Sequence, residues 1–343
     1  MTVLKVTVGY LYPDVMSTYG DRGNVEAIVA RCRWRGIEAE VRELRLGDAV
    51  DGGLDLIVIG SGGEAQQRLV AADLARVKGP GIRDAVIADG AAALAVGGGY
   101  ELLGRFCRPG SGPDLPGAGL FDAWTIRSRA VLGGEYGTIT EARADRHIGE
   151  LVVRWDGRLL AGFENHSGAT YLGPAARPLG QVICGHGNSG SGHEGVLLGA
   201  AVGTHLRGPC LPRNPALADF LIGAALCRRH PGARLGPLPD ELEHAARQAA
   251  LRRARQEAPR RGSGLVTAAI GAATVAGAIL GAPPAGPARR RAATRPGAAG
   301  RSLLSYAVNS YAVNSQAART QAGIGRGLLR QWVPRPGSRP GRP

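Results

Sequence analysis

Cysteine is scarce in this sequence of 343 residues, and its spacing carries no motif. The five cysteines (Cys32, Cys107, Cys184, Cys210 and Cys227) are odd in number and include no CxxC pair and no zinc-ligand spacing. This argues against a disulfide framework and a structural zinc site, and favours a reduced protein. The first residues also lack a basic segment, a long apolar run and a small-residue cleavage site, so we expect no export signal and a cytoplasmic location.

Acidic residues are almost missing from the C-terminal part. From Arg247 onward there are 17 arginines and one acidic residue, Glu257, which leaves 25 basic and 27 acidic residues in the rest. The body is therefore near neutral, and any attraction to nucleic acid or anionic lipid belongs to the tail. Because Trp332 is the only tryptophan there, base stacking is poorly supported, and a solvated, disordered tail is the favoured interpretation.

Composition divides the chain into two parts. We predict an α/β domain over 1–230 and an Ala/Arg/Gly/Pro-rich, low-order tail over 231–343, with one short helix over 239–256. The uncharged segment 265–282 is mostly alanine and glycine, which gain little from lipid, so no membrane span is expected. The duplicated pentapeptide over 306–315 is too short to be a structural repeat.

Apolar runs in the first part alternate between strand and helix character. Strands are predicted over 4–11, 37–44, 54–59 and 85–88, and helices over 24–35 and 66–78. This alternation predicts a largely parallel sheet covered by helices. Shorter strands over 150–155, 159–163 and 182–184 are expected to form a mixed second half of the same sheet. One more strand over 196–206 and a helix over 215–228, begun by proline, complete the domain.

A turn of small residues is the first feature with chemical meaning. The predicted strand ends at Asp89, and the turn through Ala95-Val96-Gly97-Gly98-Gly99 enters a helix at Tyr100. This is the layout of a nucleophile elbow, in which a strained turn holds a reactive side chain above a sheet and helix amides stabilise an oxyanion. On its own, the pattern is more often an ordinary glycine turn.

Several separate motifs, in order, strengthen that interpretation: Leu11-Tyr12-Pro13-Asp14, Tyr19-Gly20-Asp21-Arg22-Gly23-Asn24, Gly162-Phe163-Glu164-Asn165-His166, Gly203-Thr204 and Asn214-Pro215. Together they resemble the glutamine amidotransferase subunit of lipid II isoglutaminyl synthase and, more distantly, the amidotransferase domain of cobyric acid synthases. The resemblance implies a three-layer, flavodoxin-like class I amidotransferase domain without cofactors. In that family the subunit hydrolyses glutamine, and the ammonia passes to a Mur-ligase-like partner that uses ATP to amidate D-glutamate of the peptidoglycan stem.

The residues that the family uses for chemistry are replaced here. The family pattern A-V-C-G-G-Y-Q puts its nucleophilic cysteine at Gly97, and G-T-Y-L-H-G-P puts its histidine at Arg207, with His205 at the tyrosine position. Arg146 matches the arginine that contacts glutamine. Glycine supplies no thiolate, and arginine is not deprotonated to act as a base, so we expect negligible glutaminase activity.

Other groups were considered as replacements for the lost pair. Cys184 lies near His186 in the sequence, with His205 as a further neighbour, but a buried small hydrophobe and a loop histidine are the simpler interpretation. Cys107 follows the turn by ten residues, which corresponds to about 15 Å along a helix. His166 and His193 have no metal-ligand spacing, and no metal is expected.

Two functional hypotheses remain from the sequence. The first is the amidotransferase subunit, impaired in this copy or retained as a scaffold that docks on a Mur-ligase-like subunit. The second is a dinucleotide-binding module, because Gly60-Ser61-Gly62-Gly63-Glu64-Ala65 has the form GxGxxA, follows a strand and is followed by Asp89. The second is weaker, because this fingerprint normally follows the first strand of its unit.

Overall fold

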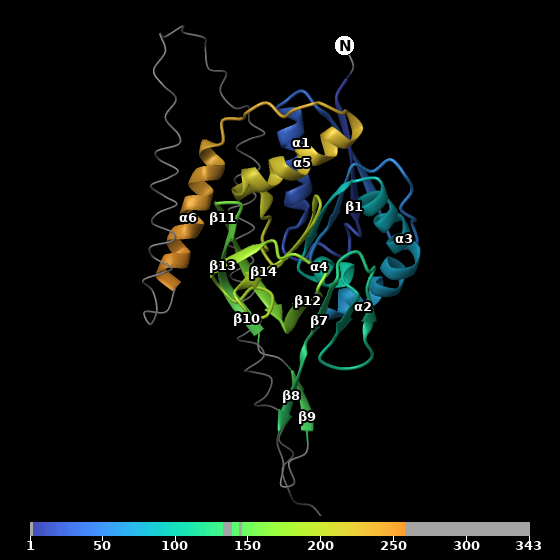
Figure 1. Cartoon of the computed structure of the whole chain (residues 1–343), viewed down its shortest axis with the longest axis vertical. Helices are drawn as coiled ribbons and strands as arrows, with labels where there is room; N and C mark the ends of the chain where they lie inside the picture. The colour runs from blue at the N-terminus through green and yellow to red at the C-terminus, as the bar shows by residue number, and fades with distance from the viewer. Residues whose placement is uncertain (1–2, 133–138, 144–145, 258–343) are drawn as a thin grey trace, which may run out of the picture.

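A computed structural model describes residues 3–132, 139–143 and 146–257 (Figure 1). Its main sheet has six strands in the order β15-β16-β4-β3-β1-β2. β1 (Lys5–Leu11), β2 (Glu38–Leu44), β3 (Leu56–Ile59), β4 (Ala92–Val96) and β16 (Ala201–Thr204) pair in parallel, and β15 (Val196–Leu198) pairs antiparallel with β16. The predicted α/β class with a mostly parallel central sheet is confirmed.

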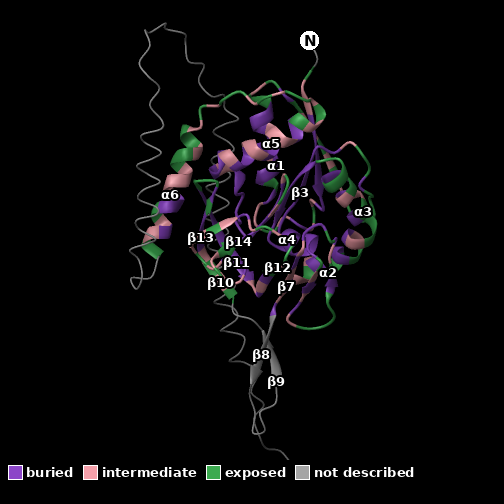
Figure 2. Ribbon diagram, viewed as in Figure 1, coloured by how far each residue is buried: buried purple, intermediate pink, exposed green. Residues whose placement is uncertain are grey.

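The central strands of this sheet are buried (Figure 2), because helices cover both of its faces. Successive side chains of a strand point to opposite faces. Leu56 and Val58 of β3 belong to a core with α1 (Arg22–Arg33) and α5 (Pro215–Arg229). Ile57 and Ile59 face the opposite core, which contains α2 (Glu64–Asp73) and α3 (Gly79–Arg83). The result is three layers, helix on sheet on helix.

The strand predicted over 85–88 is wrong. This segment is a π-helical turn, η2 (Asp84–Ala88), that continues from α2 through η1 (Leu74–Lys78) and α3. Ile82, Ala85 and Val86 are buried whereas Ile87 is 62% exposed, which is helical spacing. The strand is instead β4, a run of small apolar residues buried on both sides, and it leads directly into Gly97.

The prediction that the later strands extend the main sheet is also wrong. One separate four-stranded sheet has the order β11-β10-β13-β14, and a second has the order β12-β7-β5-β6. Likewise, 196–206 is not one strand, because positive φ at Gly199 turns the chain between β15 and β16, where Leu198 pairs with Ala201. The bounds are β5 (Phe106–Arg108), β6 (Leu115–Pro116), β7 (Ala123–Ile126), β10 (Arg146–Trp155), β11 (Arg158–Ser167), β12 (Ala169–Leu172), β13 (Gly180–Cys184) and β14 (His193–Glu194).

Five shorter or later elements complete the described part. α4 (Gly98–Leu103) follows β4, β8 (Ser128–Leu132) and β9 (Ile139–Arg143) form a hairpin, η3 (Leu211–Arg213) is a 3-10 turn, and α6 (Glu241–Glu257) lies against β10 and β11. The short helix expected over 239–256 is therefore present. It packs on the domain although it lies beyond the predicted boundary at residue 230. Segments 265–282 and 306–315 lie outside the described residues.

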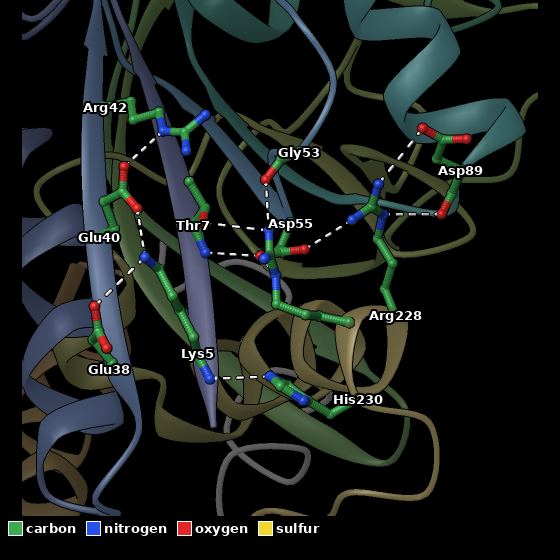
Figure 3. A network of polar contacts seen from close by, with 11 residues as sticks. Lys5, Thr7, Glu38, Glu40, Arg42, Gly53, Asp55, Asp89, Arg228 and His230 are labelled. Atoms are coloured by element: carbon green, nitrogen blue, oxygen red, sulfur yellow. Dashed lines mark hydrogen bonds and ion pairs between the residues drawn. The ribbon is translucent and has the colours of Figure 1, made fainter. Parts of the chain in front are cut away.

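Buried Asp55 fastens the end of α5 to the sheet (Figure 3). Its carboxylate accepts hydrogen bonds from the backbone N–H of Thr7 at 2.8 Å, from Arg228 at 2.8 Å and from Arg229 at 2.7 Å. Arg228 also reaches Asp89 at 3.5 Å. Because a buried carboxylate needs several donors, this network holds α5 across the amino ends of β1 and β3 and leaves the opposite sheet edge for the site.

Candidate active site

Gly97 lies where β4, in the interior of the sheet, ends. Its φ of 54° and ψ of −114° fall in a region that only glycine adopts without strain. Its N–H donates to the carbonyl of Thr204 at 2.8 Å, which ties the ends of β4 and β16 together, and α4 begins at the next residue. The geometry is that of an elbow between a strand and a helix at the carboxyl edge of a parallel sheet, as the sequence predicts.

The guanidinium of Arg207 fills the space above this glycine. A Cβ placed on Gly97 would lie 2.5 Å from Cζ and 2.6 Å from Nη2 of Arg207, and 2.8 Å from Oγ of Ser61. Real Cβ atoms do not approach other atoms so closely, so no side chain fits at position 97 unless Arg207 moves. The backbone of Arg207 is fixed because it pairs with Phe163 of β11 through two hydrogen bonds, of 2.8 and 3.4 Å.

Arg207 is a buried cation held by weak partners. The residue is 4% exposed, its Cζ lies 4.8 Å from the ring centroid of Tyr19, and its Nε has no hydrogen-bond partner. Burial lowers the pKa of Arg207, and the charges of Tyr19, Glu101 and Asp21 oppose that shift. The guanidinium nevertheless stays protonated near neutral pH and cannot act as a base.

A second loop closes over the elbow from the end of β3. The backbone N–H of Ser61 donates to Asp21 at 2.8 Å, and burial raises the pKa of the Asp21 carboxyl. Gly60 packs against Met16 and Asp21 with no space for a Cβ, and Gly62 packs against Met16. The glycines of the GxGxxA pattern therefore contact the protein itself. Since Asp89 follows a helical turn rather than a strand, the geometry does not favour dinucleotide binding.

Arg146 joins the same region from β10. Its Nε donates to Oδ1 of Asn165 at 2.7 Å, and its Nη2 lies 3.4 Å from the hydroxyl of Tyr19. Tyr19 thus contacts both arginines, Arg207 with its ring and Arg146 with its hydroxyl. Gly97, Arg207 and Arg146, which are far apart in the sequence, are brought together, while their correspondence to the family positions stays a prediction.

One buried network beside the elbow was missed from the sequence. Glu101 of α4 forms an ion pair with Arg127 and accepts a hydrogen bond of 2.7 Å from Nε2 of Gln67. Glu101 is 2% exposed and Arg127 is 7% exposed. An acidic residue inside the apolar run 98–103 was the only available signal, and its partner lies 26 residues away.

Neither cysteine considered as a replacement nucleophile is activated. Sγ of Cys184 lies 3.8 Å from the carbonyl of Ala254 in α6, and burial raises the pKa of its thiol. Cys107 is not on the helix that follows the elbow, because α4 ends at Leu103. It lies on β5 with Sγ 4.0 Å from Oε1 of Gln67, and burial raises the pKa of its thiol to about 12.

Four histidines form two stacked ring pairs next to the site. The ring of His205 stacks on that of His166, with centroids 4.1 Å apart, and His147 stacks on His186 at 3.4 Å. Nε2 of His205 lies 3.1 Å from Oγ1 of Thr170. Among the residues described, no group of three or more His, Cys, Asp or Glu side chains is arranged to hold a metal ion. In that same part of the chain, no helix is long and apolar enough to cross a membrane.

Comparison with known proteins agrees with this geometry. A family model described as a CobB/CobQ-like glutamine amidotransferase domain matches residues 7–215. The match covers more than half of the chain and includes both the elbow at Gly97 and Arg207. The chain belongs to this family of glutamine amidotransferases.

Individual relatives narrow the assignment. The chain is 30% identical over 256 residues to subunit GatD of lipid II isoglutaminyl synthase (glutamine-hydrolyzing) from Staphylococcus aureus strain N315, which covers 74% of this chain and 98% of the relative. It is also 30% identical over 230 residues to the same subunit from Streptococcus pneumoniae strain ATCC BAA-255 / R6, covering 66% and 82%. A cobyric acid synthase from Pelotomaculum thermopropionicum shares 30% identity over 162 residues, 45% of this chain and 29% of the relative. The resemblance inferred from the motifs is confirmed.

Proposed function

We propose that this chain is a GatD-type subunit of a peptidoglycan-amidating complex whose glutaminase activity has been lost. The assignment to this complex rests on the similarity to GatD subunits of lipid II isoglutaminyl synthase. The loss of activity is inferred from the contact between Arg207 and Gly97. The nucleophile position has no side chain, and the guanidinium occupies the volume that a thiol there would need. In another hydrolase, loss of the nucleophile costs on the order of 10⁶ in turnover, about 8 kcal/mol of barrier.

A remaining role for such a subunit is to dock on a Mur-ligase-like, ATP-dependent partner in the cytoplasm. The fold supports this because the substituted site is still folded: Arg207, Ser61 and Asp21 are all buried, and the elbow backbone keeps its hydrogen bonds to neighbouring elements. A complex of this kind would amidate D-glutamate with free ammonia rather than with glutamine.

Glutamine hydrolysis tests the proposal with four proteins: the chain itself, Gly97→Cys, Arg207→His and the double variant, each with and without the partner. We expect no glutamine-dependent ammonia release from the chain or from either single variant. Gly97→Cys stays silent because Arg207 still covers position 97, and Arg207→His because it has no thiol. Activity is expected in the double variant alone. Ammonia release by the unmodified chain at a rate within tenfold of the double variant would contradict the proposal.

Docking is tested separately by co-purification of the chain with the Mur-ligase-like subunit. We expect a stable complex that amidates its acceptor when ammonium is supplied and fails when glutamine is supplied instead. Failure to recover any complex would remove the scaffold role while leaving the loss of hydrolysis untouched.

A further inference from the structure

Arg207 differs from the other buried arginines whose partners are known. Arg31, 2% exposed, pairs with Asp219 at 2.8 Å and with Asp240 at 2.7 Å, and Arg127 pairs with Glu101. No carboxylate of the described residues forms an ion pair with Arg207, and its Nε donates to nothing. A buried guanidinium without an acceptor is costly, so this group is complementary to an anion that the chain itself does not supply.

A second guanidinium faces the same place. Arg146 is exposed, and its hydrogen-bond partners, Asn165 and Tyr19, are neutral. Its charge is close enough to lower the pKa of Arg207, so the two cations repel each other. An anion between them would replace that repulsion with two charge-assisted contacts. Tyr19 is half-buried and contacts both guanidinium groups, so the two cations lie on either side of one residue.

The carboxylates near these groups have other partners. Three carboxylates (Asp21, Glu101 and Glu64) lie near the three arginines Arg146, Arg207 and Arg127. Arg127 forms ion pairs with Glu101 and with Glu64, and Asp21 accepts a hydrogen bond from the backbone N–H of Ser61. Of these three positive charges, those of Arg207 and Arg146 therefore have no carboxylate partner among the described residues.

We propose that Arg207 and Arg146 bind a short dicarboxylate amino acid of the L-glutamate type, with one carboxylate on each guanidinium. The proposal rests on the proposed function, since it assigns a ligand to the site that has lost its nucleophile. A guanidinium is a donor only, and a carboxylate is an acceptor only, so the two form paired hydrogen bonds. The side-chain amide of glutamine has only one acceptor oxygen and no charge, and its NH₂ group cannot pair with the donors of Arg207. The substitution at 207 therefore changes the preference from the amide to the acid.

Calorimetric titration of the full chain with L-glutamate and L-glutamine tests this preference. We expect glutamate to bind at least tenfold more tightly than glutamine. In Arg207→Gln, glutamate binding should weaken at least tenfold and the preference should vanish. In Arg146→Gln, both amino acids should lose affinity by a similar factor, because both carry the α-carboxylate. Arg158→Gln, which removes an exposed arginine at the turn between β10 and β11, serves as the matched control and should change neither.

Thermal unfolding shows whether each variant is folded, and Arg207→Lys provides a second substitution in case Arg207→Gln does not fold. The lysine keeps the charge but not the forked donors, so a folded Arg207→Lys chain should bind glutamate with reduced affinity and a reduced preference. Equal binding of the two amino acids by the unmodified chain, binding of neither, or a preference that survives in Arg207→Gln would overturn the proposal. If the chain hydrolyses glutamine, the proposed function fails instead. A silent chain that does not prefer glutamate overturns this inference alone.

Discussion

The residues that fit at position 97 depend on the size of the side chain at position 207, and the reverse also holds. Position 97 has a backbone conformation that favours glycine, and the guanidinium of Arg207 fills the volume beside it. Phe163 holds the backbone of Arg207, and the ring of Tyr19 contacts its guanidinium. The effects of Gly97→Cys and Arg207→His on the free energy of unfolding should therefore not be additive, as expected for residues in direct contact.

Gly97→Cys in the unmodified background is expected to lower the free energy of unfolding by about 1–3 kcal/mol, because it adds a side chain to a filled space. The same change in an Arg207→His background should cost at least about 1 kcal/mol less, since the smaller ring vacates part of that volume. Urea unfolding of the four proteins gives the coupling. Gly52→Cys, where an added Cβ meets nothing within 4 Å, is the control and should be nearly neutral. Equal costs of Gly97→Cys in both backgrounds would show that Arg207 does not restrict position 97.

At the scale of elements, α6 extends the packed body beyond the predicted boundary at residue 230. Ala250, Leu251 and Ala254 on one side of α6 form a small core with Val152 and Leu159 of the β10–β11 pair. Arg253 also reaches Glu150 at 2.8 Å. The opposite faces of β10 and β11 contribute Leu151 and Leu160 to the main core, so this sheet lies between the main domain and α6.

Leu251→Ala is expected to lower the free energy of unfolding of the α6 contact by about 2–4 kcal/mol, because the side chain is 3% exposed and leaves a cavity. Leu242→Ala in the same helix removes a side chain that is 44% exposed and should cost less than about 0.5 kcal/mol. Amide hydrogen exchange across α6 distinguishes the two, since only Leu251→Ala should accelerate exchange along the whole helix. Similar exchange in both variants would mean that α6 is not held by this core.

The local sequence predicts individual helices and strands better than it predicts how the strands pair. Strands β1, β2 and β3 and helices α1 and α5 were predicted within a few residues, because each has a clear period or a terminal signal such as Gly36 or Pro215. β4 was misplaced because its alanine-rich run has low strand propensity and depends on burial between β3 and β16. The division into separate sheets depends on pairings between distant residues, which no local pattern specifies.

The site shows the same division between local and distant information. Motif positions identified Gly97, Arg207 and Arg146, and the elbow at Gly97 follows from its local sequence. The contact between Arg207 and Gly97, and the Tyr19 side chain that links the two arginines, arise only from the fold. The Glu101–Arg127 pair was missed for the same reason, because its two residues come from α4 and from the end of β7.

At the scale of the whole molecule, buried titratable groups make stability depend on pH. Burial lowers the pKa of His205 well below its ordinary value, and the nearby charges of His166, Arg207, Arg127 and His186 lower it further. His205 is therefore neutral in the folded protein at a pH where the unfolded chain already binds a proton. Its contribution is complete above the unfolded pKa of about 6.5 and is lost as the pH falls below that value.

Stability should accordingly fall between pH 7.5 and pH 5, with His205 contributing at most about 1.4 kcal/mol per pH unit below its unfolded pKa. His186 and His244, whose pKa values are also lowered by burial, change stability in the same direction. Asp21 and Glu194 oppose them, because burial raises their pKa values and their contribution is lost as the pH rises through the folded pKa.

Urea unfolding at pH 5, 6 and 7.5 of the unmodified chain and of His205→Gln separates these contributions. The substitution removes one titrating group and leaves the carboxyls in place, so the pH-dependent loss of stability should be smaller in the variant whatever its absolute stability is. His230→Gln is the control, since that ring accepts a hydrogen bond from Lys5 at the distant end of α5 and has no contact with His205. Identical slopes in the unmodified chain and His205→Gln would show that the folded protein tolerates a charge beside Arg207. That result would also weaken the assignment of an unpaired positive charge to Arg207.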